Sequence, residues 1–170
     1  MAKIIGHEYP VSKIFSPEFD FVIPFYQRPY SWTTEEAGEL FDDITNFMDK
    51  QEDSSTEDPY FLGSIVLIKA EDSPKAEVID GHQRLATLTL LLAALVERLS
   101  GDEARSLAKY INEPGDLAED RPPKPRLTLR ERDRDFFRDY VQTEGQLSTM
   151  AEMDVEDLSD PQKNIQANAR

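Results

Sequence analysis

The stretch that decides the fold is Glu77-Val-Ile-Asp-Gly-His-Gln-Arg-Leu-Ala-Thr-Leu-Thr-Leu-Leu-Leu-Ala-Ala-Leu95. Residues 78–80 predict the end of a short buried strand, and Gly81 turns the chain. From His82 the apolar spacing becomes helical. The apolar face is wider than a surface helix needs, so we expect this helix to run through the centre of the domain. The face consists of Leu85, Leu88, Leu91, Leu92, Leu95, Val96 and Leu99.

A strand, a turn at Gly81 and a helix that begins with Gln83-Arg84 place free backbone N–H groups beside a guanidinium. Such an arrangement holds phosphate, carboxylate or sulfate at a helix N-terminus. The motif alone has low specificity, because many α/β proteins have a glycine at a strand-to-helix turn with no ligand nearby. The remaining segments must therefore decide between the two interpretations.

Length and composition limit the class of protein. The 170 residues suffice for one domain, alone or with an appendage. The absence of cysteine excludes disulfides and a thiolate zinc site. No membrane span and no secretory signal is visible, which predicts a cytoplasmic protein. The formal charge of −15 argues against a general DNA-binding surface, although it leaves room for one local basic pocket.

The other regular segments predict an α/β (α+β) fold, with a small mixed sheet, a central buried helix and a C-terminal helical appendage. The segments at 60–69 and 75–80 are close enough to form an antiparallel hairpin. A Thr33–Glu36 capping box starts a helix that runs to about Lys50. Its apolar stripe is Leu40, Phe41, Ile44, Phe47 and Met48. Further helices are expected at 11–15, 102–111 and 130–141, and further extended pieces at 19–23 and 126–129.

Glycine and proline residues in the second half of the chain indicate where the helices are expected to end. Gly101 stands where a glycine would end the central helix. Residues 112–125 contain four prolines and several acids, which predicts a loop. Beyond residue 141 the pattern is weak, with two short helices separated at Asp160-Pro161.

Arginines in two of the polar segments are the candidates for anion contact. Arg28 lies in Tyr26-Gln27-Arg28-Pro29-Tyr30-Ser31-Trp32, and Arg84 in Asp80-Gly81-His82-Gln83-Arg84. A planar guanidinium matches the oxygens of a phosphate, which a lysine does not imitate. For either arginine alone, a structural salt bridge to Asp80 or Asp43 is an equal alternative.

Each neighbouring polar residue has a functional and a structural interpretation. Asp80 would hold a divalent ion through water or orient Arg84, but for the residue alone a helix N-cap is favoured. Gln27 and Gln83 would bond a ligand or place a water, or else satisfy loop backbone groups. His82 would act as a general acid or base, and with only His7 as a second histidine no histidine-rich metal site is expected.

Aromatic and small residues complete the candidate site. Tyr26, Tyr30 and Trp32 would stack on a base, although packing is the commoner role and is favoured for Trp32. Gly63-Ser64 within a strand indicates close approach by a backbone or a ligand, with a plain β-bulge as the alternative. No phosphate loop, HExxH motif or GxSxG elbow is present, so an enzyme here would depend on Asp, Gln, Arg and a bound metal.

Three motifs in order, IPFYQRPYSW at 23–32, YFLGSIVLI at 60–68 and VIDGHQRLATLTLLLAAL at 78–95, resemble the N-terminal domain of GmrSD-type restriction systems. This GmrS-like family has a fold related to ParB and sulfiredoxin and includes the phosphorothioate-sensing SspE proteins. The usual signature of the family is DGQQR. Asp80, Gly81, Gln83 and Arg84 match it, whereas His82 replaces the first glutamine and leaves the water-positioning role of that position open.

The resemblance implies a domain that binds and hydrolyses a nucleotide (GTP, ATP or CTP) and is coupled to cleavage of modified or foreign DNA in antiphage defence. It implies phosphate contacts from Gln27, Arg28, Gly63, Ser64, Gly81 and Arg84. The catalytic residues would be Asp80, His82, Gln83 and Arg84, with Asp80 supporting Mg²⁺. Pro29, Tyr30 and Trp32 would contact the base or modified DNA.

The resemblance also implies a division of the chain. Residues 1–111 would form the nucleotide-binding domain, 112–125 a proline-rich acidic loop, and 126–170 a helical extension leading to a nuclease region or partner outside this sequence. Association into a homo-oligomer is left open. The competing hypothesis is a non-enzymatic reader of modified DNA, such as a phosphorothioate, that uses the same pocket. A purely structural docking domain would bind neither ligand.

Overall fold

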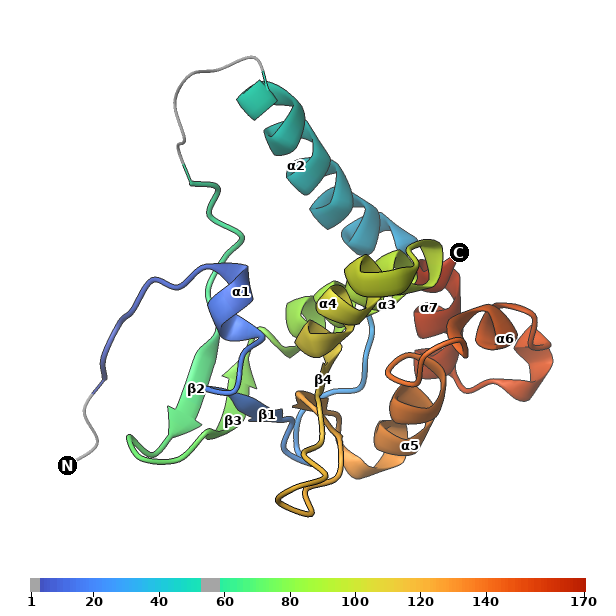
Figure 1. Ribbon diagram of the computed structural model, residues 1–170. Helices are drawn as coiled ribbons and strands as arrows, with labels where there is room; N and C mark the ends of the chain where they lie inside the picture. Colours follow the sequence, from blue (N-terminus) through green and yellow to red (C-terminus); the bar gives the residue numbers. More distant parts are fainter. Residues whose placement is uncertain (1–3, 53–58) are drawn as a thin grey trace.

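A small sheet covered by helices forms the protein, as shown by a computed structural model in which residues 4–52 and 59–170 are described. Figure 1 shows the sheet at one end and the helices gathered around α3. The helices are α1 (Val11–Ile14), α2 (Thr34–Glu52), α3 (His82–Arg98), α4 (Gly101–Ile111), α5 (Glu131–Tyr140), α6 (Leu147–Ala151) and α7 (Asp160–Ala169), with a 3₁₀ turn at Val155–Asp157. The strands are β1 (Asp20–Val22), β2 (Val66–Lys69), β3 (Lys75–Asp80), β4 (Asn112–Glu113), β5 (Lys124–Pro125) and β6 (Leu127–Thr128).

The main sheet is mixed, with the strand order β2-β3-β1-β6. The predicted hairpin is confirmed, because β2 and β3 pair antiparallel. β1 pairs in parallel with β3 on one side and with β6 on the other, so that Phe21 lies opposite both Ala76 and Leu127. These three side chains are almost fully buried and form the centre of the core. The predicted mixed α/β fold is confirmed.

The central helix α3 begins and ends close to the predicted residues, but it buries only part of the predicted face. Leu85 and Val96 are buried, and Leu88 and Leu92 pack partly buried against the core. Leu95 and Leu99 are 42% and 40% exposed. The helix is apolar on almost every side, so leucine spacing could not single out the face that packs. The small side chains on the buried face allow the neighbouring elements to approach closely. The buried face consists of His82, Gln83, Leu85, Ala86, Thr87, Thr89, Leu90, Ala93 and Val96.

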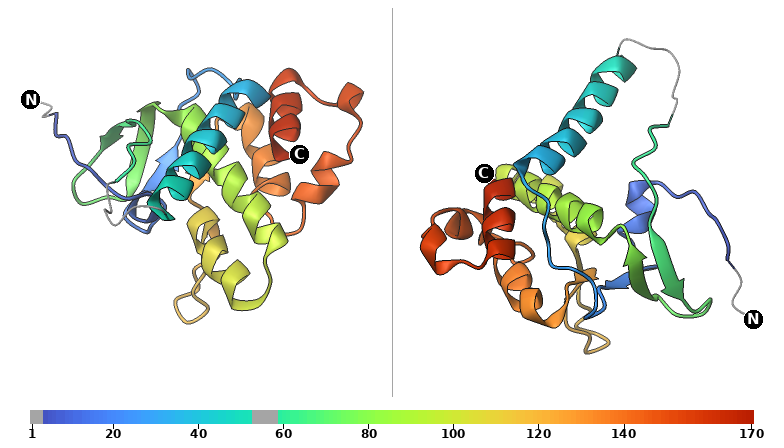
Figure 2. Two further views of the ribbon diagram at one scale, coloured as in Figure 1. Left: turned by 90° about the horizontal axis from the view of Figure 1, so that it is seen from above. Right: turned by 180° about the vertical axis from the view of Figure 1, so that it is seen from behind.

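Helix α2 starts as predicted, since the backbone N–H of Thr33 donates to Glu36 Oε2 at 2.7 Å. The helix then leaves the body of the protein, as Figures 1 and 2 show. Of its apolar stripe only Leu40 is buried, while Phe41 is 50% and Met48 61% exposed. The stripe is amphipathic as predicted, but most of it does not face the core.

Two boundaries differ from the prediction. Gly101 is the first residue of α4 rather than the end of α3, which stops at Leu99 with an extended backbone. The segment predicted as a loop at 112–125 begins and ends with the paired strands β4 and β5, and Asp116 bridges to Arg121 between them. Prolines near both ends do not prevent the pairing, because a two-stranded ribbon has open edges where a missing N–H costs little.

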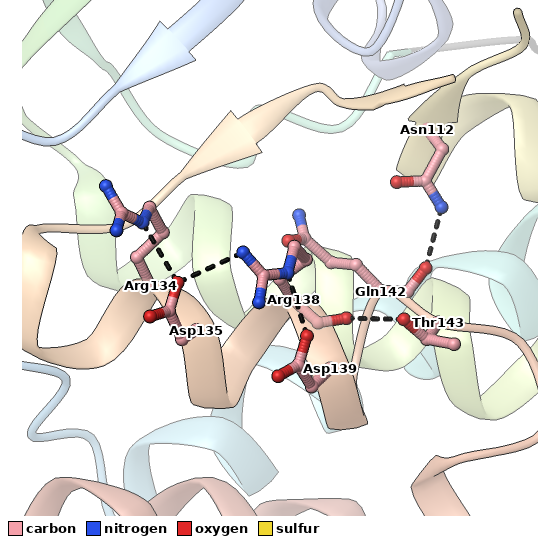
Figure 3. Close-up of polar contacts among 7 residues, drawn as sticks. All are labelled: Asn112, Arg134, Asp135, Arg138, Asp139, Gln142 and Thr143. Atoms are coloured by element: carbon pink, nitrogen blue, oxygen red, sulfur yellow. Dashed lines mark hydrogen bonds and ion pairs between the residues drawn. The ribbon is translucent and has the colours of Figure 1, made fainter. Parts of the chain in front are cut away.

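The C-terminal residues complete the sheet and cover α3. β6 occupies an edge of the main sheet, and α5 packs Phe137 against the core as predicted. Figure 3 shows ion pairs of Arg134 and Arg138 along α5 and the bond from Asn112 Nδ2 to the Gln142 carbonyl. Gln142 also donates to the Leu127 carbonyl at 2.8 Å, which ties the end of α5 to β6. Pro161 lies in the first turn of α7, so it starts that helix instead of separating two helices.

Whether residues 1–111, 112–125 and 126–170 are functional units stays a prediction, although strands from both sides of residue 112 share one sheet. Within the described parts of the chain no helix is long and apolar enough to cross a lipid bilayer.

The buried face of α3 can be tested with two substitutions on the same helix. Leu90 is 2% exposed and Leu95 is 42% exposed. We expect Leu90→Ala to lower the free energy of unfolding by about 2–5 kcal/mol, because it leaves a cavity in the core. Leu95→Ala should cost less than half as much in urea denaturation. Equal losses for both variants would contradict this helix orientation.

Candidate functional site

The turn between β3 and α3 is fixed by a close contact. Gly81 is the N-cap of α3 and has φ 92°, a left-handed conformation that favours glycine. A Cβ there would lie 2.6 Å from Ile65 Cγ2. Asp80 precedes the cap and is exposed, so the alternative role of Asp80 as N-cap is not observed. No side chain caps α3 and its first turn has no acid, which leaves a free helix N-terminus for an anion.

Gln83 is buried and holds the aromatic loop. Its Oε1 accepts hydrogen bonds from the backbone N–H of Ser31 at 2.8 Å and of Trp32 at 3.3 Å. Its Nε2 donates to the Pro29 carbonyl at 2.9 Å and lies 2.9 Å from His82 Nε2. The structure therefore brings the first and third predicted segments together, with the Gln83 amide fully occupied by the protein.

Gln27 has a similar role at the other end of the loop. Its Nε2 donates to the Ile79 carbonyl at 2.8 Å, at the end of β3. Both glutamines thus satisfy backbone groups in this structure, which is one of the two roles considered from the sequence. Their predicted contacts with a ligand or a water stay predictions.

His82 is 9% exposed and lies beneath the loop. Burial lowers the pKa of His82, and the nearby Arg28 charge lowers it further, against the opposing effects of the Arg28 carbonyl and Asp80. The ring Nε2 is 3.2 Å from the Arg28 carbonyl and 2.9 Å from Gln83 Nε2. A single nitrogen either donates or accepts, so Nε2 donates to the Arg28 carbonyl in one tautomer and accepts from Gln83 Nε2 in the other. Because its pKa is lowered from the usual value of about 6.5, His82 is mostly neutral at pH 7.

Arg84 lies flat against the second predicted segment. Gly63 has φ 112°, and a Cβ there would be 2.7 Å from Arg84 Cζ, so only glycine leaves room for the guanidinium. Arg84 Nη1 donates to the Ser64 carbonyl at 3.4 Å, and Arg84 Cζ is 6.0 Å from the Trp32 ring centre. Arg84 Nε is buried and has no hydrogen-bond partner. Gly63 and Ser64 precede β2 and do not lie within a strand as predicted, and the close approach at Gly63 is made by the Arg84 side chain and not by a backbone.

Arg28 is exposed and stands beside the free end of α3. Its charge contributes to lowering the pKa values of both His82 and Glu36, which places the guanidinium near both. Among the described residues, neither Arg28 nor Arg84 forms an ion pair with a carboxylate. The alternative of a salt bridge to Asp80 or Asp43 is thus not observed.

The aromatic residues divide into buried and exposed ones. Tyr30 is 4% exposed, and its hydroxyl lies 2.8 Å from both Thr87 Oγ1 and Asn168 Nδ2. Burial raises the pKa of Tyr30 above its usual value. Trp32 and Pro29 are half-buried, whereas Phe25 and Tyr26 are 85% and 59% exposed and contact each other edge to face. The exposed aromatic surface in the three segments is thus the Phe25–Tyr26 pair, Phe61 at 74% exposure and part of Trp32.

The site is a shallow surface rather than an enclosed cavity. A cavity of about 10 Å³ lies behind Arg28, Tyr30 and His82, enough for one water. A larger cavity of about 310 Å³ lies near the C-terminal ends of α3 and α4, lined in part by Val96 and Ile111.

Metal binding at the site would depend on a single protein carboxylate. Within the described ranges, no group of three or more His, Cys, Asp and Glu side chains is arranged to hold a metal ion. Mg²⁺ in phosphate-transferring proteins is held by one or two carboxylates together with the phosphates of the substrate. The exposed Asp80 fits that limited role.

Residues missed from the sequence support the site from outside the three motifs. Asn168 contacts both Tyr30 and Trp32 from α7, and Thr87 bonds Tyr30 from α3. A hydrogen bond to the Asp43 carboxylate raises the pKa of Tyr60, whose ring lies 5.2 Å from that of Phe47. Thr87 lies about one turn after the motif residues on the predicted helix, so its place near the site could have been predicted. No sequence signal marks Asn168.

The neutral state of His82 predicts a pH dependence of stability. Because the folded pKa is lowered, the unfolded chain binds more protons below its own pKa of about 6.5, so this stability is lost as pH falls. We expect His82→Gln to show a smaller loss of unfolding free energy than the wild type between about pH 7.5 and pH 5.5. Urea denaturation at both pH values measures this, with His7→Gln as the matched control. Identical pH dependence in His82→Gln and wild type would contradict a buried neutral His82.

Comparison with known proteins gives one family. The family described as GmrSD restriction endonuclease, N-terminal domain, matches residues 11–170. This range contains the whole sheet, the three motifs and all helices of the described chain. A search of curated proteins found no match.

Proposed function

The chain belongs to the GmrSD restriction endonuclease N-terminal domain family, and from this premise we propose that it binds a nucleoside triphosphate and hydrolyses it. The triphosphate would lie at the N-terminus of α3, between Arg28 and Arg84. The domain would act as the regulatory part of a restriction system that cleaves modified phage DNA. A nuclease domain or partner and the DNA itself belong to this proposal.

The observation that carries the proposal is the position of Arg28 and Arg84, both without a carboxylate partner, at the uncapped N-terminus of α3. The formal charge is −15, and five other arginines form ion pairs with neighbouring acids, namely Arg105, Arg121, Arg130, Arg134 and Arg138. Within the described chain, Arg28 and Arg84 have no such partner, and neither have Arg98, Arg126, Arg132 and Arg170. What distinguishes the two motif arginines is their place beside the start of α3. Both flank an uncapped helix N-terminus, where a bound anion gains from backbone N–H groups and guanidinium together.

Each arginine supports a different part of phosphate binding. Arg84 is held flat by Gly63, Ser64 and Trp32, so its orientation is set before a ligand arrives. A preoriented guanidinium loses less conformational entropy on binding. Arg28 is exposed on the loop that Gln27 and Gln83 fasten, so it can close over the phosphates from the other side.

Hydrolysis would follow from positioning and charge stabilisation, as in phosphoryl transfer generally. Mg²⁺ bound with the triphosphate would neutralise charge on the phosphates, and Asp80 is the residue that would hold it. The attacking water is assigned to Gln83 and His82. Both are held by the loop in this structure, so a rearrangement of residues 29–32 on ligand binding is part of the proposal. The base of the nucleotide would contact Trp32 and Tyr26, because the Tyr30 ring is buried.

The second candidate function is recognition of modified DNA, which is favoured by the exposed Phe25–Tyr26 pair. These rings stand next to Arg28 and Pro29 on a turn that Gln27 closes onto the Pro24 carbonyl. Sulfur in place of a phosphate oxygen is less well hydrated, so apolar rings beside a guanidinium suit a phosphorothioate. Here the same arginines would contact a DNA backbone instead of a triphosphate.

Calorimetric titration with GTP, ATP and CTP in the presence of Mg²⁺ tests the nucleotide proposal. We expect one of these to bind, and Arg84→Ala and Arg28→Ala each to weaken binding about 10- to 100-fold, through the loss of charge-assisted hydrogen bonds. Arg138→Ala removes a paired arginine on α5 and should leave the affinity unchanged. Unchanged affinity in both motif variants, with the fold intact, would refute the phosphate assignment.

Binding of phosphorothioate and unmodified duplexes at one stated salt concentration separates the two candidates. If the domain is a DNA reader, the modified duplex binds more tightly and Phe25→Ala removes that preference without changing the salt dependence of binding. A preference for modified DNA without nucleotide turnover would replace the nucleotide proposal. Equal affinity for both duplexes would exclude the reader.

A further inference from the structure

We infer that Asn168, in the last turn of α7, is a positioning residue for the arginine site, because it fixes the segment Tyr30-Ser31-Trp32 against which Arg84 rests. The consequence for ligand binding depends on the proposed function, whereas the positioning itself does not. Asn168 lies outside the three motifs.

The hydrogen bonds of Asn168 are directed at the loop. Its Nδ2 donates to the Tyr30 hydroxyl at 2.8 Å and to the Trp32 carbonyl at 2.9 Å. Its Oδ1 is buried without a hydrogen-bond partner. A buried unpaired acceptor costs free energy, so the side chain is oriented by its two donor contacts and not by the needs of its oxygen.

The hydrogen bonds continue from Asn168 through Tyr30 into α3, and the donor of each bond is determined. Thr87 Oγ1 donates to the Gln83 carbonyl at 2.9 Å, so the Tyr30 hydroxyl donates to Thr87 Oγ1 and accepts from Asn168. Gln83 in turn bonds the backbone of Pro29 and Ser31. Residues 29–32 are therefore held by amide side chains from two helices, α3 and α7.

Trp32 transmits this constraint to the site. Its ring centre lies 6.0 Å from Arg84 Cζ, and its carbonyl is the second acceptor of Asn168. Without Asn168, the backbone at Trp32 keeps only the longer 3.3 Å bond to Gln83 Oε1. The ring would then leave one side of the Arg84 guanidinium open, and the preorientation of that arginine would be lost.

The position of α7 is itself fixed by buried contacts. Gln166 is 2% exposed and donates from Nε2 to the Met150 and Met153 carbonyls, both at 2.8 Å. Ile165 lies in the core, and α7 contacts α2, α3, α5 and α6. Figure 2 shows α7 beside α3, on the side of the helix group away from β2 and β3. Any displacement of α7 therefore reaches Trp32 through Asn168.

Trp32 is the single tryptophan of the chain, so its fluorescence reports on this contact directly. In Asn168→Ala we expect Trp32 to be more readily quenched by acrylamide than in the wild type. Asn164→Ala, one turn earlier on the same helix, is the matched control and should leave the quenching unchanged. Asn168→Ser and Tyr30→Phe provide milder variants if Asn168→Ala fails to fold.

The same variants connect the inference to the proposed function. Asn168→Ala should weaken binding of the nucleotide that the wild type binds by about three- to tenfold, as expected for the loss of one or two hydrogen bonds. A turnover assay should show this as a raised KM with a nearly unchanged kcat. Asn164→Ala should alter neither.

The outcomes separate the two claims. If the quenching of Trp32 is unchanged in folded Asn168→Ala or Asn168→Ser, the positioning role is overturned, whatever the nucleotide results. If quenching rises but the wild-type protein binds no nucleotide, the proposed function fails and the positioning role stands. If quenching rises and nucleotide affinity is unaffected, Asn168 fixes Trp32 without contributing to the site, and the inference is overturned.

Discussion

The hydrogen bonding of the buried Gln83 amide is the constraint on which the rest of the site depends. Its oxygen accepts from Ser31 and Trp32, and its nitrogen donates to Pro29 and lies against His82 Nε2. Each group would cost about 1–3 kcal/mol if left buried and unpaired. One side chain in the first turn of α3 thus sets the path of residues 29–32, the loop that carries the aromatic residues over the start of this helix.

Much of the fold followed from local patterns in the sequence. The capping box at Thr33, the β2–β3 hairpin, the turn at Gly81 and the apolar side of α5 are each encoded by adjacent residues, and each is confirmed. The buried face of α3 was predicted only in part, because its sequence is apolar on nearly every side and packing determines which residues are buried. The exposure of α2 and the β4–β5 pairing also depend on what surrounds them, which local patterns do not contain.

The candidate site was predictable as a set of segments but not as a set of bonds. Three motifs marked the loop, the glycine segment and the turn, and the structure brings these together. The residues that join them do so by roles that sequence does not distinguish. A glutamine that bonds a ligand and one that bonds a loop have the same neighbours in sequence, and Asn168 contacts the loop from a polar, weakly patterned segment. Tyr30 is buried only because Thr87 and Asn168 satisfy its hydroxyl.

The pairing of β1 with β6 has a consequence for how the chain folds. Phe21 lies beside Leu127 in parallel register, so the edge strand β6 joins the sheet only through a contact between residues far apart in sequence. Such contacts form slowly, because a long loop must lose its entropy before the contact stabilises it. During synthesis the first three strands and the Gly81 turn emerge well before β6. Until Leu127 arrives, one side of β1 is an unpaired edge, available to a chaperone or to another nascent chain.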